Sequence, residues 1–174
     1  MIRPVLRCPD GVKFFDYWAS LPKSDFVPDR RDFDPVQIPQ TMPWVTMLDV
    51  HSAERVMFRL FGTGLVDLTG VDLTGENYPD YVGEDHREAL GRTLVVQSER
   101  PCGRVNILKG QTAQGRSYTI EAVTLPLSHK SHDRTLLLGF AGIVDVSGEG
   151  EPGFAVASVE DPVWIDVGAG VPDF

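Results

Sequence analysis

Residues 56–75 read VMFRLFGTGLVDLTGVDLTG, and this stretch decides the predicted fold. Residues 56–61 are apolar except for Arg59 and rich in β-branched and aromatic side chains, which is typical of a strand. Glycines at positions 62, 64, 70 and 75 then leave room only for very short helical turns. A strand that breaks into two such turns is the layout of small, concave sensing domains. Because the stretch holds no nucleophile motif, metal-ligand cluster or phosphate-binding loop, it favours signalling over catalysis.

The composition indicates a cytoplasmic protein of one domain with extensions. The chain has 174 residues, enough to bury a core without disulfides or metals. Its two cysteines, Cys8 and Cys102, lack metal-ligand spacing and suggest a reducing compartment. No apolar run reaches the roughly 20 residues needed to span a bilayer, and no signal-peptide pattern opens the chain. The formal charge of −9 argues against nucleic-acid binding and favours protein or small-molecule partners.

An aromatic helix is predicted near the N-terminus, over residues 11–21. Phe14, Tyr17, Trp18 and Leu21 fall at the i, i+3, i+4 and i+7 spacing of one helical face, and a proline follows. This apolar stripe must dock on something, either on its own domain or on a second copy of the chain. The four residues are therefore the candidate dimer or partner surface.

The pattern that follows predicts an α+β domain. A helix from about Asp85 to Arg100 separates a hairpin from three further strands. The last strand is apolar throughout, as a central strand with both faces covered would be. The expected sheet is five-stranded and antiparallel, with helices across one face. The expected strands are residues 44–50, 55–61, 103–109, 117–127 and 135–146, and the expected short turns are residues 64–69 and 76–82.

The chain is predicted to divide into an N-terminal helical extension (1–43), a core (44–147), and a linker with a tail (148–174). The tail is too short to be a domain and holds one apolar patch at residues 163–165. Three alternatives stay open for it: packing back on the core, docking on a partner, or disorder.

A pocket is predicted between the sheet and its helices. On strand 103–109, Val105 and Ile107 share one face while Arg104 and Asn106 share the other. The alternative for every candidate lining residue is plain core packing. The candidates are Phe58, Leu60, Leu68, Tyr81, Leu94, Ile107 and Ile120.

Five pieces of the chain, in order, resemble the PAS domain family. They are residues 15–18 (FDYW), 28–35 (PDRRDFDP), 58–63 (FRLFGT), 70–75 (GVDLTG) and 125–127 (LPL). Within that family the chain is similar to the short stand-alone PAS proteins of alphaproteobacteria, a fifth (PAS_5-like) subfamily, over roughly residues 12 to 147. The resemblance implies the PAS fold and a non-enzymatic sensor or regulatory protein of bacterial signalling.

The resemblance also assigns a role to the end of the last strand. PAS domains commonly end this strand with an aspartate, an aliphatic residue and a hydroxyl residue that couple the sheet to an effector. Asp145, Val146 and Ser147 match that pattern, and only about 27 residues follow them. The chain is therefore expected to bind a small apolar ligand, a protein partner or a second copy of itself, as a homodimer. The alternative is a pure dimerisation module with a filled core.

His86 is the candidate cofactor ligand, because haem-binding PAS sensors carry an iron-ligating histidine on the corresponding helix. The alternative is an exposed residue of the first helical turn, and haem is the minor hypothesis. The carboxylate pairs at residues 84–85 and at Asp67 and Asp72 fit helix starts and turns, so neither a catalytic residue nor a metal site is predicted. Arg59 is expected to be exposed or to pair with Glu121 across strands.

Overall fold

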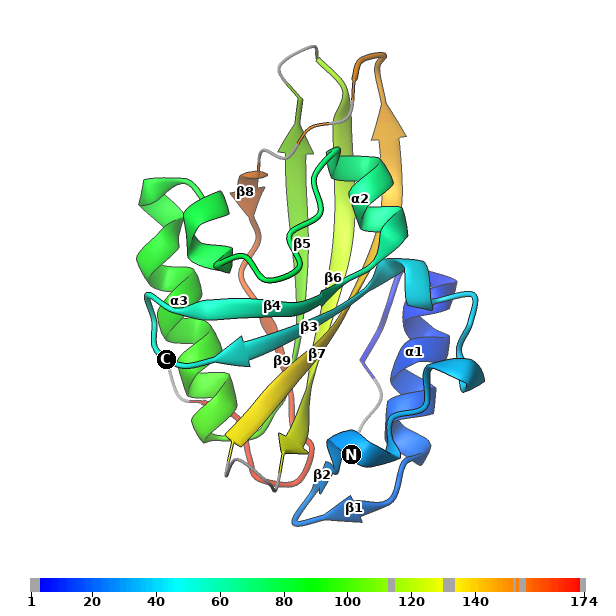
Figure 1. Cartoon of the computed structure of the whole chain (residues 1–174), viewed down its shortest axis with the longest axis vertical. Coiled ribbons are helices and arrows are strands. Elements are labelled where there is room, and N and C mark those ends of the chain that lie inside the picture. Colours follow the sequence, from blue (N-terminus) through cyan, green and yellow to red (C-terminus); the bar gives the residue numbers. More distant parts are fainter. Residues whose placement is uncertain (1–3, 113–114, 130–133, 152, 154–155, 173–174) are drawn as a thin grey trace.

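The computed structural model describes residues 4–112, 115–129, 134–151, 153 and 156–172. Its architecture is α+β, as predicted, with helices packed around one large antiparallel sheet (Figure 1). The helices are α1 (Pro9–Ser20), α2 (Thr63–Thr69) and α3 (Glu84–Glu99), with 3-10 turns η1 (Arg30–Asp32), η2 (Pro35–Gln37), η3 (Met42–Trp44) and η4 (Tyr78–Tyr81). The strands are β1 (Lys23–Ser24), β2 (Val27–Pro28), β3 (Val45–Val50), β4 (Val56–Phe61), β5 (Gly103–Gln111), β6 (Ser117–His129), β7 (Arg134–Ser147), β8 (Val156–Val159) and β9 (Val163–Ile165).

The main sheet contains all five predicted strands and two more. Its order is β4-β3-β7-β6-β5-β8, and β9 also pairs with β5. The two additional strands come from the C-terminal segment, where Val159 pairs with Leu108 and Ile165 with Gly103. The C-terminal segment therefore packs back on the core, which was the first of the three alternatives, and it covers the edge of β5.

Both faces of the sheet are covered by helical structure. α1 packs on β6 and β7 on one side, while α2, η4 and α3 lie on the other side (Figure 1). The apolar run at the start of β7 supplies both layers, because successive side chains of a strand point to opposite faces. Leu136 and Leu138 belong to the core under α1, and Leu137 belongs to the core under α3. The expectation of a central strand covered on both faces is therefore confirmed for this part of β7.

α1 docks on its own sheet. Phe14 and Trp18 are completely buried, the ring of Phe14 stacks on Phe140 at 5.5 Å between centroids, and Trp18 Nε1 donates to the Pro126 carbonyl at 2.9 Å. These two side chains are therefore not available to a partner, which corrects the expectation that they form a dimer surface. The reason is that the sheet face beneath them is apolar and needs cover. Tyr17 and Leu21 are only half-buried.

A buried carboxylate holds the segment that leads into α1. Glu121 on β6 is 1% exposed, and its two oxygens accept the backbone N–H groups of Arg7 at 2.7 Å and Cys8 at 3.0 Å. Charge-assisted hydrogen bonds of this kind are stronger than neutral ones. Glu121 is therefore the polar anchor of the N-terminal segment on a sheet face that is otherwise apolar.

Replacing Glu121 with glutamine is expected to destabilise the fold. The amide keeps one acceptor oxygen but turns its NH₂ group toward a backbone N–H, so one of the two anchoring bonds is lost. We expect the free energy of unfolding to fall by about 1–3 kcal/mol in urea denaturation. Glu99→Gln, at the exposed end of α3, is the control and should change little. An unchanged midpoint for Glu121→Gln would contradict the anchoring role.

Candidate ligand pocket

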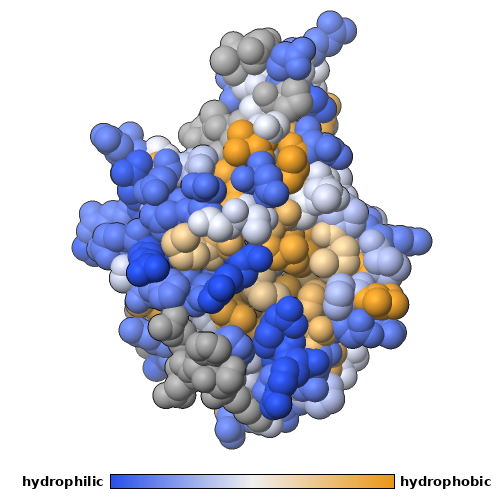
Figure 2. All heavy atoms as spheres, viewed as in Figure 1, coloured by the Kyte–Doolittle hydropathy of each residue, from blue (hydrophilic) through white to orange (hydrophobic). Residues whose placement is uncertain are grey.

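A cavity of about 280 Å³ lies between the sheet and the helical layer of α2, η4 and α3. This volume is just below the range for drug-sized ligand sites, about 300–1,000 Å³, and therefore suits a small ligand. In the view of Figure 2, hydrophobic side chains gather in the middle of the molecule and polar residues frame them. The apolar lining includes Leu48, Phe58, Phe61, Leu65, Leu68, Leu90, Leu108 and Ile120.

Three of the seven candidate lining residues border this cavity, namely Phe58, Leu68 and Ile120. Leu60 and Ile107 do not border it. Leu60 packs against the core under α1, and Ile107 alternates along β5 with Asn106 and Leu108, which line the cavity. Tyr81 and Leu94 do not border the cavity either, and both pack into the neighbouring core cluster. The cavity-facing stripe of α3 is His86, Ala89, Leu90 and Thr93, and Tyr78 takes the place expected for Tyr81.

A β-bulge in β4 explains the error at Leu60. Met47 pairs with Leu60, but the next residue, Leu48, pairs with Phe58, so Arg59 is an extra residue on β4. An extra residue reverses the alternation of side chains. Phe58 and Phe61 therefore both face the cavity, with their rings edge-to-face at 5.2 Å, while Leu60 packs in the core under α1.

The polar face of β5, not its apolar face, turns toward the cavity. Arg104, Asn106 and Leu108 line it, whereas Val105 belongs to the core under α1. Arg104 is 8% exposed and Asn106 is 7% exposed. Their alternation with Val105 and Ile107 was visible in the sequence, but polar residues on a strand ordinarily face solvent, so neither was a candidate. Two polar residues of the cavity lining were missed for this reason.

Two titratable groups near Arg104, the Tyr78 phenol and the Cys102 thiol, are neutral at physiological pH. Burial raises the pKa of the Tyr78 phenol, although the charge of Arg104 opposes the shift. Burial also raises the pKa of the Cys102 thiol to about 11. Burial lowers the pKa of Arg104 itself, yet a guanidinium keeps its proton in proteins. The cavity therefore has a cationic corner next to an apolar wall.

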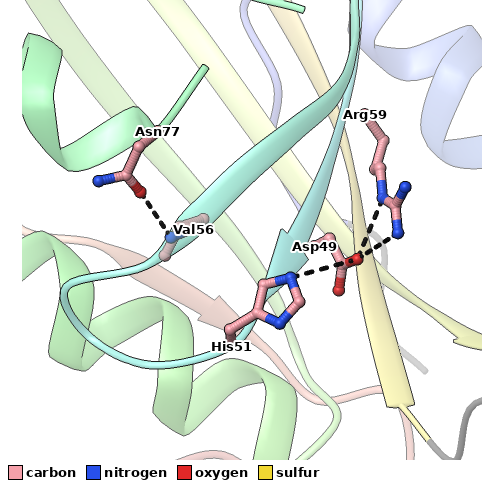
Figure 3. A network of polar contacts seen from close by, with 5 residues as sticks. All are labelled: Asp49, His51, Val56, Arg59 and Asn77. Atoms are coloured by element: carbon pink, nitrogen blue, oxygen red, sulfur yellow. Dashed lines mark hydrogen bonds and ion pairs between the residues drawn. The ribbon is translucent and has the colours of Figure 1, made fainter. Parts of the chain in front are cut away.

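A second polar network lies at the edge of the sheet and is structural (Figure 3). Asp49 on β3 is 2% exposed and accepts from Arg59 Nε at 3.0 Å and Nη2 at 2.7 Å, while His51 Nε2 lies 3.4 Å away. Arg59 therefore pairs with Asp49 and not with Glu121. Ser52 donates to Glu54 at 2.8 Å rather than to His51, so these side chains are not arranged as a catalytic triad.

Asn77 completes that edge (Figure 3). Its Oδ1 accepts the Val56 N–H at 2.9 Å, and its Nδ2 donates to the Glu54 carbonyl at 3.0 Å. These bonds attach the segment before η4 to the β3–β4 hairpin. They hold the helical layer over the cavity.

His86, the candidate haem ligand, is exposed and lies at the rim of the cavity in the first turn of α3. Within the described ranges, no group of three or more His, Cys, Asp or Glu side chains could hold a metal ion. Among the same residues, none of the helices has the length and apolar character to cross a membrane.

A sheet that carries a ligand-sized cavity under a short helical layer defines the class of small α+β sensory modules. Residues 6–141 match the family model described as PAS domain, so the chain belongs to the PAS domain family. PAS domains serve signalling as sensors and interaction modules. The matched region includes α1 and ends within β7, before β8 and β9 begin. A search of curated proteins gave no match.

The position of α3 over the cavity depends on Gly91. A Cβ atom added at Gly91 would overlap the backbone carbonyl of Ala53, in the turn between β3 and β4. No side chain that could move away is involved, since the obstacle is main chain. Gly91 therefore permits the close approach of α3 to the hairpin.

Gly91→Ala is expected to destabilise the protein by about 1–3 kcal/mol, the usual cost of overpacking. Helix propensity alone predicts the opposite sign, because alanine is favoured over glycine by about 1 kcal/mol inside a helix. Gly83→Ala is the matched control, since nothing lies within 4 Å of an added Cβ there. Denaturant unfolding of both variants is the measurement, and a stabilised Gly91→Ala variant would contradict the close approach.

Proposed function

We propose that the chain is a non-enzymatic, cytoplasmic PAS sensor of bacterial signalling that binds a small ligand in the cavity. The observation that carries this proposal is the cavity itself, which is lined by strands and helices together. Protein interiors are ordinarily packed without voids of ligand size, and a space of this size beneath the helical layer therefore supports ligand binding over the alternative of a filled core. Cys8 and Cys102 are both free thiols, which supports a reducing compartment.

β7 supports a route from the cavity to the surface. Gly139, Phe140 and Ala141 line the cavity, and the same strand continues to Asp145 and Ser147, which are exposed. A ligand that favours one position of β7 would change the strand end that PAS domains use for coupling. Asp145 and Ser147 are accordingly the proposed output residues.

A larger side chain in the cavity is expected to prevent ligand binding without unfolding the protein. Ala122 on β6 is half-buried and lines the cavity, so Ala122→Leu places three more carbon atoms in it. We expect native mass spectra of the full chain, purified from its own host, to show a species with the added mass of a ligand. The fraction of protein in that species should fall at least tenfold in Ala122→Leu. Ala169→Leu, at an exposed position outside the lining, is the control. A bare mass for the unmodified protein would contradict ligand sensing.

A second candidate function is self-association through the end of β7. Pairing with β3 reaches only Phe140, while pairing with β6 continues to Ser147, so the strand end extends past α2 (Figure 1). Val144 and Val146 there are 38% and 39% exposed. An apolar pair at a projecting strand end favours a partner surface. We propose a homodimer formed at this end, with exposed parts of Tyr17 and Leu21 on α1 as the other candidate surface.

Sedimentation velocity separates the two surfaces. The double substitution Val144→Ser with Val146→Ser is expected to weaken the dimer at least tenfold, because the apolar contact is removed. Val163→Ser changes another exposed valine, on β9, and should leave the dimer intact. A dimer that persists in the double variant would exclude the strand end, and a monomeric unmodified protein would exclude self-association.

A further inference from the structure

A buried arginine faces the cavity from β5. Arg104 is 8% exposed, lines the cavity, and stands opposite Thr124 of β6 in the strand register. A guanidinium remains charged at every physiological pH and carries five donors in a planar fork. The charge is therefore a permanent feature of this side of the cavity.

No carboxylate compensates this charge within the part of the chain that the structure describes. None of the ion pairs there, formed at N–O distances up to 4.0 Å, includes Arg104. Its Nε atom is buried and has no hydrogen-bond partner among the described residues. Its titratable neighbours include the Tyr78 phenol and the Cys102 thiol, whose pKa values are raised by burial, so neither supplies a negative charge at physiological pH. A buried charge without an opposite charge costs several kcal/mol, so its burial points to an external anion.

Two acidic residues, Glu160 and Asp161, also line the cavity. Both are exposed, neither forms an ion pair with Arg104 among the described residues, and Glu160 pairs with Lys109 at 3.0 Å. Asn106, two residues after Arg104 on the same face, donates through Nδ2 to the Glu160 carbonyl at 3.4 Å. The C-terminal segment is therefore held beside β5 by polar contacts.

One wall of the cavity, formed by β3, β4 and α2, is largely apolar. Phe58 and Phe61 of β4, Leu65 and Leu68 of α2, and Leu48 of β3 form it. A ligand that satisfies both sides needs one anionic group and a hydrocarbon or aromatic body.

We propose that the cavity binds an organic carboxylate, with its carboxyl group on Arg104 and its apolar body against β4 and α2. Arginine and carboxylate match as two parallel N–H···O bonds, which is the geometry that a planar fork favours. Asn106 and Thr124 are polar neighbours that can donate to the same group. This inference rests on the proposed ligand-binding function and specifies its chemical class.

Three probes with one chain length and different head groups test the inference. Titration calorimetry of the full chain at pH 7.4 compares octanoate, octanol and octylamine. We expect octanoate to bind at least tenfold more tightly than octanol, and octylamine to bind most weakly, because it places a cation near Arg104. Equal affinities for octanoate and octanol would overturn the carboxylate inference while leaving a ligand-binding cavity in place. Binding of none of the probes, with a bare native mass from the host, would overturn both.

The variant Arg104→Met tests whether the preference for octanoate depends on Arg104. Methionine keeps an unbranched side chain and removes the charge, so the preference for octanoate over octanol should disappear. Arg92→Met, on the exposed face of α3 and outside the lining, is the matched control and should retain the preference. The unfolding midpoint of Arg104→Met should be equal to or higher than that of the unmodified protein, since an uncompensated buried charge is gone. A preference that persists in Arg104→Met would overturn the role of Arg104.

Discussion

The docking of α1 on the sheet is the interaction on which the rest of the structure depends. A sheet face as apolar as that formed by β6 and β7 must be covered, and Phe14 and Trp18 cover it from within the same chain. Glu121 anchors the N-terminal segment on this face. The cavity lies on the opposite face, under the helical layer of α2, η4 and α3. One side of the sheet thus carries packed core, and the other carries the cavity for which we propose ligand binding.

Two features of the strands then give the cavity its chemistry, a bulge in β4 and the inward-facing polar residues of β5. The bulge at Arg59 turns Phe58 and Phe61 to the same side, which makes one wall aromatic. On β5, the alternation is regular, but the polar residues face inward and Arg104 brings a charge into the core. An apolar wall beside a buried cation suits an amphipathic anion better than a purely apolar ligand.

Membership of the PAS family and the path of β7 are the basis of the proposed link between the cavity and an output. β7 lies at the centre of the sheet, contributes Gly139 to Ala141 to the cavity, and carries Asp145 and Ser147 at its free end. A packed central strand has few positions available, so a ligand that distinguishes between them transmits a discrete change. Binding at the middle of β7 and self-association at its C-terminal end are therefore compatible proposals.

The order and type of the main elements, and the family, followed from the sequence, because these depend on local patterns. Glycine breaks, the helix from Asp85 and the apolar run of β7 are all readable within short windows. The tertiary structure alone decided which face lines the cavity, the pairing of Arg59 with Asp49, and the return of the C-terminal segment to β5. Alternation shows that Arg104 and Asn106 share a face. Which way that face turns depends on register and on what packs against each side of the sheet, and these are properties of distant parts of the chain.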